Sequence, residues 1–346
     1  MQIYIPNIKF SNVDKRSLFI LTRPFYSENS WSNNTKHIWN ISNDINYINT
    51  IKNANIYLIP ENVTNYSKSE LFEINNICAK HQIFAFGFIG GDFVKKLGTY
   101  SNIIFYCAGG FKRQLSQNYK GFPVSLSDHF QRIYQKDEID VRPKHELPVV
   151  GFCGHADLSS LKRIKENIKY LKENIKRLFN NPLRKDYEPF FPSAYNRAKL
   201  LHSLEQSKKI NSNFIYRKKY RGGAVTPNQR EQTTIEYYDN IYNSDYVLCV
   251  RGAGNFSVRF YETLMLGRIP IFVNTDCLLP FEDKINWKNH VVWIEWKERK
   301  NIANIVADFH ANLSNEEFMN IQTQNRKLWK ETLSVKGMLS IINNDI

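Results

Sequence analysis

The residues best suited to chemistry are concentrated in one segment, YVLCVRGAGNFSVRFYETLMLGRIPIFV, at positions 246–273. A run of apolar residues leads into Gly252 and Gly254, which allow a tight turn and a close backbone approach to a ligand. A helix is predicted to begin after Ser257, whose hydroxyl suits an N-cap. Because the free N–H groups of a helix start attract anions, this turn predicts an anion site.

Charged side chains around this turn indicate which anion it would bind. Arg251 and Arg259 flank the turn, and the guanidinium fork matches phosphate oxygens. Glu262 follows about one and a half turns into the helix, where a carboxylate can accept hydrogen bonds from ribose hydroxyls. The group predicts a nucleoside-diphosphate pocket; the alternative is that Arg259 and Glu262 form only a surface ion pair. Neither GxGxxG nor a P-loop motif occurs, which disfavours a dinucleotide fold or a P-loop NTPase.

Two other loops carry candidate ligands for the same anion. The sequence YRKKYRGG ends a predicted strand, and Arg217 or Arg221 could hold the diphosphate there. The alternative is a solvated basic loop. Gly154 and His155 end another predicted strand, in a loop that could admit the donor phosphates or the acceptor.

Strand and helix patterns alternate along the first half of the chain. The predicted strands lie at 17–22, 55–60, 82–88 and 102–108, the second of them stopped by Pro60. A helix is predicted at 67–80, where Ser67 and Glu70 form a capping box. This order favours a layer of parallel strands covered by helices.

The second half repeats the alternation. Its predicted strands lie at 148–154, 213–217, 245–250, 268–273 and 290–296. Its predicted helices lie at 157–179, 228–243, from Ser257 to Gly267, 298–312 and 315–332. The charged segment 135–147 is predicted to be a linker. We therefore expect an α/β protein with two doubly wound parallel sheets, at 1–146 and 147–346, facing a ligand-binding cleft.

Charge narrows the classes of partner. The 346 residues carry a formal net charge of +14, which suits nucleic acid, an anionic membrane face or a phosphorylated substrate. The cations are spread over the whole chain and no nucleic-acid-binding motif appears, so nucleic acid is not expected. The helix at 157–179 has an apolar stripe and a basic outer face, which could lie against an anionic membrane or be solvated.

Targeting and redox features favour a cytoplasmic protein. No apolar run approaches the length of a membrane-spanning helix, and the N-terminus lacks the pattern of a secretory signal. The five cysteines are scattered without zinc spacing, which predicts reduced thiols and no metal site.

Residues 238–296 resemble the exostosin family, glycosyltransferase family 47. The shared pattern is a strand, RGxGxxSxRxxE, a short helix, GxIP, a second strand, and LPF followed by a tryptophan. This chain carries it at Arg251, Gly252, Gly254, Ser257, Arg259, Glu262, Gly267, Ile269, Pro270, Leu279, Pro280, Phe281 and Trp287. The resemblance implies a GT-B architecture, with the acceptor on 1–146 and the nucleotide sugar on 147–346.

The same resemblance implies an inverting glycosyltransferase that moves a sugar from a nucleotide sugar, expected to be a UDP-sugar, to a glycan acceptor. Animal and plant members are usually membrane-anchored, so this chain resembles a microbial or viral member. Its acceptor would then be a lipid-linked or surface polysaccharide such as capsule or lipopolysaccharide. Trp31 and Trp39, in the acceptor half, could stack on sugar rings or be buried.

Charge stabilisation and proton transfer complete the expected chemistry. The sequence contains no DxD triplet, so arginines and a helix start, without metal or cofactor, are expected to stabilise the leaving diphosphate. An inverting transfer needs a general base. Asp92 follows Gly90 and Gly91 at a strand end and is the predicted base; the alternative is a turn aspartate that caps a following helix. Other candidates are Glu61, Asp128 and His129.

Two other classes of function stay open. One is a basic nucleic-acid-binding protein, suggested by the net charge alone. The other is a non-catalytic glycan-binding relic of the fold, which would not bind a nucleotide. The intact motif at 251–262 argues against the relic.

Overall fold

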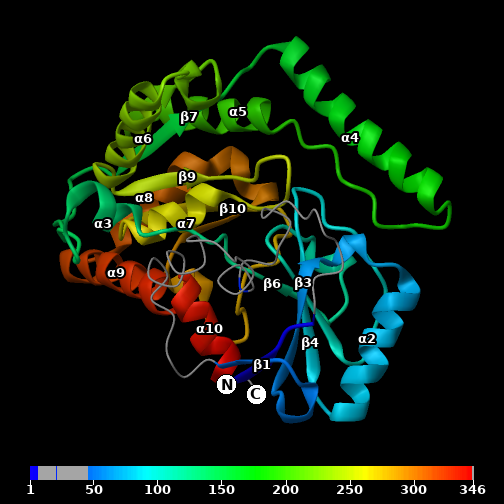
Figure 1. Cartoon of the computed structure of the whole chain (residues 1–346). Coiled ribbons are helices and arrows are strands. Elements are labelled where there is room, and N and C mark those ends of the chain that lie inside the picture. Colours follow the sequence, from blue (N-terminus) through cyan, green and yellow to red (C-terminus); the bar gives the residue numbers. More distant parts are fainter. Residues whose placement is uncertain (7–20, 22–45, 345–346) are drawn as a thin grey trace. The chain divides into compact units, whose positions relative to one another are not determined.

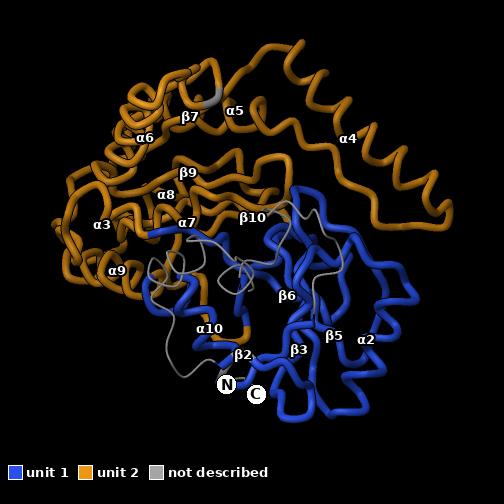
Figure 2. Tube along the Cα trace, viewed as in Figure 1, with its two compact units in different colours: residues 1–127, 276–282, 330–346 blue, residues 128–275, 283–329 orange. Residues whose placement is uncertain are grey.

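The computed structural model describes residues 1–6, 21 and 46–344. The chain forms two compact units, shown in Figure 2. Unit 1 comprises residues 1–127, 276–282 and 330–346, and unit 2 comprises residues 128–275 and 283–329. The predicted strand at 17–22, apart from Leu21, lies outside the described residues, as do Trp31 and Trp39.

Unit 1 is built on a parallel sheet with the strand order β2-β1-β3-β4-β5-β6 (Figure 1). The strands are β1 (Gln2–Tyr4), β2 (Asn46–Ile48), β3 (Ile56–Asn62), β4 (Phe84–Ile89), β5 (Ile103–Cys107) and β6 (Tyr119–Gly121). The helices are α2 (Lys68–His81) and α10 (Val335–Asn344), with 3-10 turns η3 (Ile51–Asn53), η4 (Val63–Asn65) and η5 (Lys112–Gln114). The predicted parallel layer is confirmed.

Both faces of this sheet are covered by apolar clusters. Because successive strand residues point to opposite faces, β3 serves both clusters. Tyr57 and Ile59 join the cluster that contains Leu71 of α2. Ile56 and Leu58 join the cluster that contains α10, whose contributing residues are Val335, Met338, Leu339 and Ile342. The sheet is thus enclosed by helices from distant parts of the chain.

The start of α2 and the end of β3 show how well a capping box and a proline predict the boundaries of elements. The predicted capping box is confirmed at α2, where Ser67 Oγ accepts from the Glu70 amide at 3.3 Å and Glu70 Oε2 accepts from the Ser67 amide at 2.7 Å. The prediction that Pro60 ends its strand is wrong, since β3 continues to Asn62. Proline has no N–H to donate, and the pairing of β3 with β4 shifts register between Leu58 and Asn62.

Unit 2 contains a parallel sheet with the strand order β11-β10-β9-β7-β8. Its strands are β7 (Val149–Gly154), β8 (Asn211–Tyr216), β9 (Tyr246–Cys249), β10 (Ile269–Asn274) and β11 (Val292–Glu295). Its α-helices are α3 (His129–Tyr134), α4 (Ser160–Asn180), α5 (Ser193–Glu205), α6 (Pro227–Tyr242), α7 (Val258–Met265), α8 (Ile302–Asn312) and α9 (Asn315–Leu328). Short 3-10 turns are η6 (Tyr220–Gly223), η7 (Trp287–Asn289) and η8 (Trp296–Asn301), and a π-helical turn covers Trp329–Leu333.

The strand order of unit 2 reverses direction at one point. From β7 the chain crosses to β8 on one side, whereas β9, β10 and β11 follow on the other side. In open parallel sheets, ligands bind beyond the carboxyl ends of the strands at such a reversal. The ends of β7 and β9, at Gly154 and Cys249, are therefore the expected place for a ligand.

The predicted linker at 135–147 is not a free connection between units. The compact units divide at 127/128 rather than at the predicted 146/147, and the segment packs on unit 2. Lys144 Nζ donates to the His310 carbonyl at 2.9 Å, and His145 Nδ1 lies 2.9 Å from Asp245 Oδ2. Some of the charges that suggested a solvated linker thus contact the rest of unit 2, whereas Lys136 and Asp140 form an exposed pair within the segment at 2.7 Å.

No element was predicted for α5, although its pattern is visible in the sequence. Its buried residues recur at helical spacing, at Ala194, Ala198, Leu201 and Leu204. The polar residues Asn196 and Arg197 interrupt this pattern on the neighbouring face, which made it weak. This omission affects the functional site, because α5 supplies Arg197.

Candidate functional site

Two arginines lie over one aromatic ring at the end of β7. The Arg259 and Arg197 guanidinium carbons lie 4.3 and 5.8 Å from the centroid of the Phe152 ring. Arg259 Nη2 donates to the Cys153 carbonyl at 2.8 Å, and Arg197 Nη1 donates to the His155 carbonyl at 2.7 Å. We call Phe152, His155, Arg197 and Arg259 the Phe152 cluster.

The Phe152 cluster concentrates positive charge. Burial, together with the neighbouring Arg259 charge, lowers the pKa of Arg197 to about 10. The contacts of both guanidiniums are with carbonyl oxygens and aromatic rings, and the Nε of each has no hydrogen-bond partner among the described residues. Two like charges held together in this way favour an anion that can accept several hydrogen bonds.

His155 adds a third nitrogen to this cluster. Its Nδ1 lies 3.0 Å from the Arg217 carbonyl, which can only accept, so Nδ1 carries the proton. Its Nε2 is buried and has no hydrogen-bond partner within the described part of the chain. Nε2 is therefore available to a bound ligand, as an acceptor when neutral and as a donor when the ring is protonated.

Gly154 provides the room for the Arg259 side chain. A Cβ at Gly154 would lie 2.9 Å from Arg259 Nη2 and 3.3 Å from Phe152 Cζ. These distances are shorter than ordinary contacts, so a larger residue would displace the guanidinium or the ring. The structure therefore gives Gly154 a packing reason, while its predicted part in admitting the donor phosphates or the acceptor stays a prediction.

Glu262 lies behind Arg259 and is held by two tyrosines. Its carboxylate accepts hydrogen bonds from the hydroxyls of Tyr237 and Tyr238, the latter at 3.1 Å. Burial raises the pKa of Glu262, although Tyr237, Arg259 and Tyr238 oppose the shift. A direct Arg259–Glu262 surface pair is therefore not the arrangement found; two tyrosine hydroxyls fix the carboxylate instead.

Arg251 lies in a different environment, which we call the Glu188 cluster. Arg251 Nη2 donates to the Ala253 carbonyl at 2.7 Å and lies 4.0 Å from Glu188 Oε2. Glu188 Oε1 accepts from Arg177 of α4 at 2.9 Å. Burial raises the pKa of Glu188, and the Arg177 and Arg251 charges oppose it. The positive charge of Arg251 is thus partly compensated within the protein.

The other predicted donor-site residues differ in their surroundings. Arg217 follows β8 and is directed to α6, where its Nη2 donates to the Thr233 carbonyl at 2.7 Å and pairs with Glu236. Arg221 lies in η6 with an exposed side chain and a left-handed φ of 51°. Neither Gly252 nor Gly254 adopts a positive φ, and a Cβ at Gly252 would meet no atom within 4 Å.

Ser257 begins α7 but does not cap it as predicted. It occupies the N-cap position, and its side chain forms no capping hydrogen bond. The first amide groups of α7 are therefore not satisfied by this hydroxyl. Arg259 belongs to the same first turn, so the helix start and the Phe152 cluster lie together.

The candidate bases in unit 1 have clear local settings. Asp92 is exposed in the loop after β4, where Gly91 has a φ of 97°, so the predicted sharp turn is confirmed. No helix is found in the described segment 93–102, so Asp92 does not cap a following helix. Glu61 lies within β3 rather than after it, is fully buried and accepts from the Tyr66 hydroxyl.

The two candidate bases in unit 2 have structural partners. Asp128 caps α3 by accepting from the Gln131 amide at 3.1 Å and pairs with Arg326. The His129 ring stacks on Tyr238 at 5.0 Å between centroids. Burial lowers the pKa of His129. These contacts assign Asp128 to the packing of unit 2 and His129 to the support of Tyr238.

Residues 183–309 match the sequence model of the Exostosin GT47 domain. This range includes Arg197, Arg251, Arg259 and Glu262. Relatives include Exostosin-1 of Drosophila melanogaster, 32% identical over 101 residues that cover 29% of this chain and 13% of that protein. A probable glucuronosyltransferase of Oryza sativa is 31% identical over 71 residues, which cover 20% of this chain and 17% of that protein.

These matches support the family resemblance for this segment. The matched part spans less than one fifth of the length of each of these two relatives. A probable beta-1,4-xylosyltransferase of Arabidopsis thaliana matches over 62 residues at 32% identity, covering 18% of this chain and 15% of that protein. The relatives are animal and plant proteins, so they give no support to the expected microbial or viral origin.

Solved structures with a similar arrangement share little sequence with this chain. TarM of S. aureus, in complex with fondaparinux, alpha-GlcNAc-glycerol and UDP, is 11% identical, covers 75% of this chain and 55% of its own, and has a TM-score of 0.32. CalG4, the calicheamicin glycosyltransferase, is 8% identical, covers 84% of this chain and 68% of its own, and has a TM-score of 0.27. The predicted fold class is confirmed by the two parallel α/β sheets themselves.

Proposed function

We propose that this chain is a glycosyltransferase that binds a nucleoside diphosphate sugar on unit 2 and transfers its sugar to a glycan acceptor. The observation that carries the proposal is the Phe152 cluster, where Arg197 and Arg259 converge at the end of β7 and neither forms an ion pair with a carboxylate of the described residues. The match of residues 183–309 to the Exostosin GT47 domain supports the same reaction class.

In this proposal the diphosphate binds to the Phe152 cluster. Its oxygens accept hydrogen bonds from Arg259 and Arg197, and the amide groups at the start of α7 add positive potential. As the bond between the anomeric carbon and the diphosphate oxygen breaks, negative charge grows on the diphosphate. Guanidiniums already held in place stabilise this charge without rearranging, which lowers the barrier to transfer.

Glu262 would hold the nucleoside in the same site. Tyr237 and Tyr238 occupy part of its hydrogen-bonding capacity, and a carboxylate has about four acceptor positions in total. The remaining positions would accept the ribose hydroxyls of a UDP-sugar. The arrangement would orient the ribose relative to the diphosphate rather than take part in bond breaking.

The acceptor hydroxyl would attack the anomeric carbon from the side opposite the diphosphate, and a base would take its proton. Asp92 is the proposed base because it is an exposed carboxylate after β4. We propose that the reaction inverts the anomeric configuration, needs no metal, and builds a surface polysaccharide from a UDP-sugar.

A thermal-unfolding titration with UDP tests the donor site. At a UDP concentration about one hundred times its Kd, binding should stabilise the protein by about 2.7 kcal/mol. The variant Arg259→Ala should lose this stabilisation, because it removes a guanidinium that the diphosphate needs. Arg230→Ala, which changes an exposed arginine on α6, is the matched control and should respond to UDP as the unchanged protein does.

Equal stabilisation of the native protein and Arg259→Ala would reject the site. A screen of nucleotide sugars for release of UDP then separates an enzyme from a relic of the fold. Binding of UDP without turnover of any UDP-sugar, with or without glycan acceptors, would leave only the binding role.

A further inference from the structure

Helix α4 presents its apolar side outward. Figure 1 shows α4 extending away from the strands of unit 2. Its apolar residues recur every three or four positions and form a stripe, which consists of Leu161, Ile164, Ile168, Leu171, Ile175 and Leu178. Each of these side chains is between 43% and 72% exposed. A helix on the surface of a globular protein normally buries such a stripe in the core.

The opposite side of α4 is polar and is held against unit 2. The Tyr170 hydroxyl donates to the Ala253 carbonyl at 3.2 Å, and Asn174 exchanges two hydrogen bonds with the Glu188 backbone. Arg177, which is 1% exposed, pairs with Glu173 and Glu188 at 2.9 Å.

These contacts fix the rotation of the helix. If α4 turned to bury its stripe, the Arg177 charge would lose Glu188 and the Asp186 carbonyl and keep only Glu173 of the same helix, which is unfavourable. The prediction of a basic outer face is therefore incomplete, because the outer face contains the apolar stripe as well.

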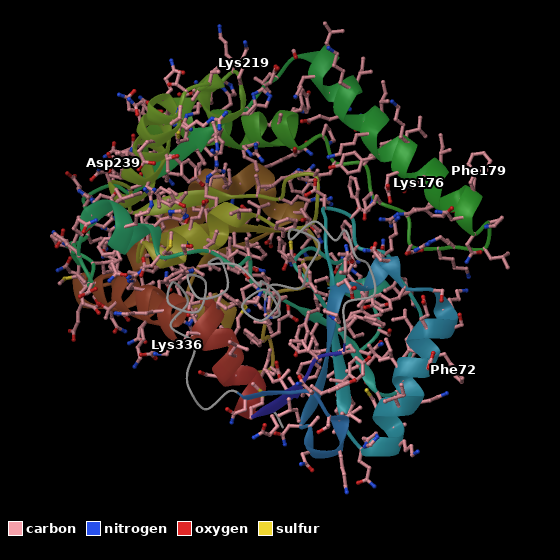
Figure 3. The ribbon with its side chains drawn as sticks, viewed as in Figure 1. Phe72, Lys176, Phe179, Lys219, Asp239 and Lys336 are labelled. Atoms are coloured by element: carbon pink, nitrogen blue, oxygen red, sulfur yellow. The ribbon has the colours of Figure 1, made fainter. Side chains whose placement is uncertain are left out.

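Apolar exposure continues beyond the helix. Phe179 and Leu183 are 84% and 88% exposed, and Leu158 and Phe190 are also exposed. Figure 3 labels Phe179 near the end of α4, with Lys176 one turn before it. A contiguous apolar patch of this kind marks a surface that contacts another phase or molecule.

Lysines run along one side of the stripe. Each follows a stripe residue by one position, so together they form a parallel row that consists of Lys162, Lys165, Lys169, Lys172 and Lys176. The two carboxylates of α4 are engaged away from this row: Glu173 pairs with the buried Arg177 of the same helix, and Glu166 accepts from the Ala194 amide of α5 at 3.0 Å. The outer surface of α4 thus combines apolar and cationic groups.

We propose that α4 lies in the interface of an anionic membrane, parallel to its plane. The stripe would enter the acyl region, while the lysine row would reach the lipid phosphates through its aliphatic stems. Among the helices that the structure describes, none combines the length and apolar character needed to cross a bilayer. The inference goes beyond the proposed function and does not depend on it.

The charge pattern favours lipid over a second copy of the chain. The positions that flank the stripe are Lys165, Asn167, Lys172 and Asn174. In a helix pair joined through the stripe, these positions would meet their counterparts, and no carboxylate would be present to pair with lysine. An anionic lipid surface, in contrast, attracts each lysine.

Vesicle co-sedimentation of the full chain tests the proposal. The protein should sediment with vesicles of phosphatidylglycerol and phosphatidylcholine, and much less with phosphatidylcholine alone. Phe179→Ser should lower the partition coefficient at least about tenfold, since it removes a ring that the acyl region of the bilayer would bury. Lys176→Gln should lower it about fivefold.

Matched controls come from exposed residues of unit 1, also labelled in Figure 3. Phe72→Ser changes an aromatic ring that is 60% exposed on α2, and Lys336→Gln changes an exposed lysine on α10. Neither should change binding. All four side chains are exposed, and thermal unfolding should verify that each variant is folded and keeps its response to UDP.

Two results would overturn the proposal. One is that Phe179→Ser and Lys176→Gln bind vesicles as tightly as the controls do. The other is a dimer in solution that Ile168→Ser dissociates, without vesicle binding by the native chain, which would assign the stripe to a second copy.

Discussion

The Phe152 and Glu188 clusters both place arginines close to the carboxyl ends of neighbouring strands. They differ in whether a carboxylate pairs with the arginine charges. In the Glu188 cluster, Arg177 lies 2.9 Å and Arg251 lies 4.0 Å from the oxygens of one buried carboxylate. In the Phe152 cluster, Arg197 and Arg259 contact carbonyl oxygens and aromatic rings. The first cluster pairs its arginines with a carboxylate, whereas neither Arg197 nor Arg259 forms an ion pair within 4.0 Å among the described residues, and Glu262 acts on Arg259 only from behind.

This difference separates two residues that the sequence motif presents as equivalent. Arg251 and Arg259 both belong to RGxGxxSxRxxE, and both suit phosphate. The surroundings of Arg251 indicate that it chiefly holds the loop after β9 near α4, while Arg259 is the residue that we propose to contact the diphosphate. Each cluster should therefore respond differently when one of its members is removed.

Removal of Glu188 should have the largest effect, and on stability. The variant Glu188→Ala leaves Arg177 and Arg251 buried without their shared carboxylate, at a cost of about 3–5 kcal/mol in the free energy of unfolding. Urea denaturation measures this cost. Glu231→Ala, whose ion pair with Arg132 is exposed on both sides, is the control and should cost about 0–1 kcal/mol. Similar costs for both variants would remove the distinction between the clusters.

Removal of Arg197 should act on ligand affinity instead. Arg197→Ala should weaken UDP binding about tenfold or more, because a charged hydrogen bond to the diphosphate is lost. Isothermal titration calorimetry measures the Kd. The control is Arg299→Ala: Arg299 also contacts a ring and a carbonyl, both of Trp296, outside the cluster. An unchanged Kd for Arg197→Ala would limit the site to Arg259.

A smaller perturbation is expected at Gly154. The added methyl group of Gly154→Ala would press on the Arg259 guanidinium, so UDP affinity should fall several-fold at a stability cost of about 1–3 kcal/mol. Gly252→Ala places its methyl group in open space and should not change the free energy of unfolding. If Gly154→Ala bound UDP with unchanged affinity, UDP binding would not depend on the present position of the Arg259 guanidinium.

The smallest effect concerns pH and the tyrosines behind the Phe152 cluster. Burial lowers the folded-state pKa of His129, which stacks on Tyr238. The unfolded chain therefore binds a proton more readily, and the free energy of unfolding should fall as pH decreases below about 6.5.

The variant His129→Gln should reduce this slope in a series of urea denaturations at different pH values. The exposed His202→Gln is the control and should keep the native slope. A native slope in His129→Gln would mean that other groups determine the acid sensitivity. His290 and His310 also have pKa values lowered by burial, so part of the slope should persist.

Local signals in the sequence predicted much of the fold. The capping box of α2, the apolar strand β3 and the turn at Gly91 depend on residues within a few positions of one another. The RGxGxxSxRxxE pattern likewise pointed to Arg259 and Glu262, whose part in donor binding stays a prediction. Patterns of this kind are readable because the physical cause and its effect lie close together in the chain.

The remaining features depend on contacts between distant positions. The compensation of Arg251 comes from Glu188, in a segment without a periodic pattern, and the site residue Arg197 lies in the helix that was not predicted. The orientation of α4 depends on Ala253 and Glu188 rather than on its own amphipathic pattern. Amphipathicity defines two faces of a helix, and only the partners determine which of them is buried.

The position of α10 has a consequence for the order of assembly during synthesis. Its residues Val335, Met338, Leu339 and Ile342 complete the second cluster on the sheet of unit 1, whose strands all precede residue 122. A ribosome must therefore translate all of unit 2 before the first-made sheet can cover that face. Unit 2 can be synthesised completely before α10 is available to unit 1. During that interval, the part of the sheet around Leu58 and Phe86 that α10 covers is exposed and prone to aggregation.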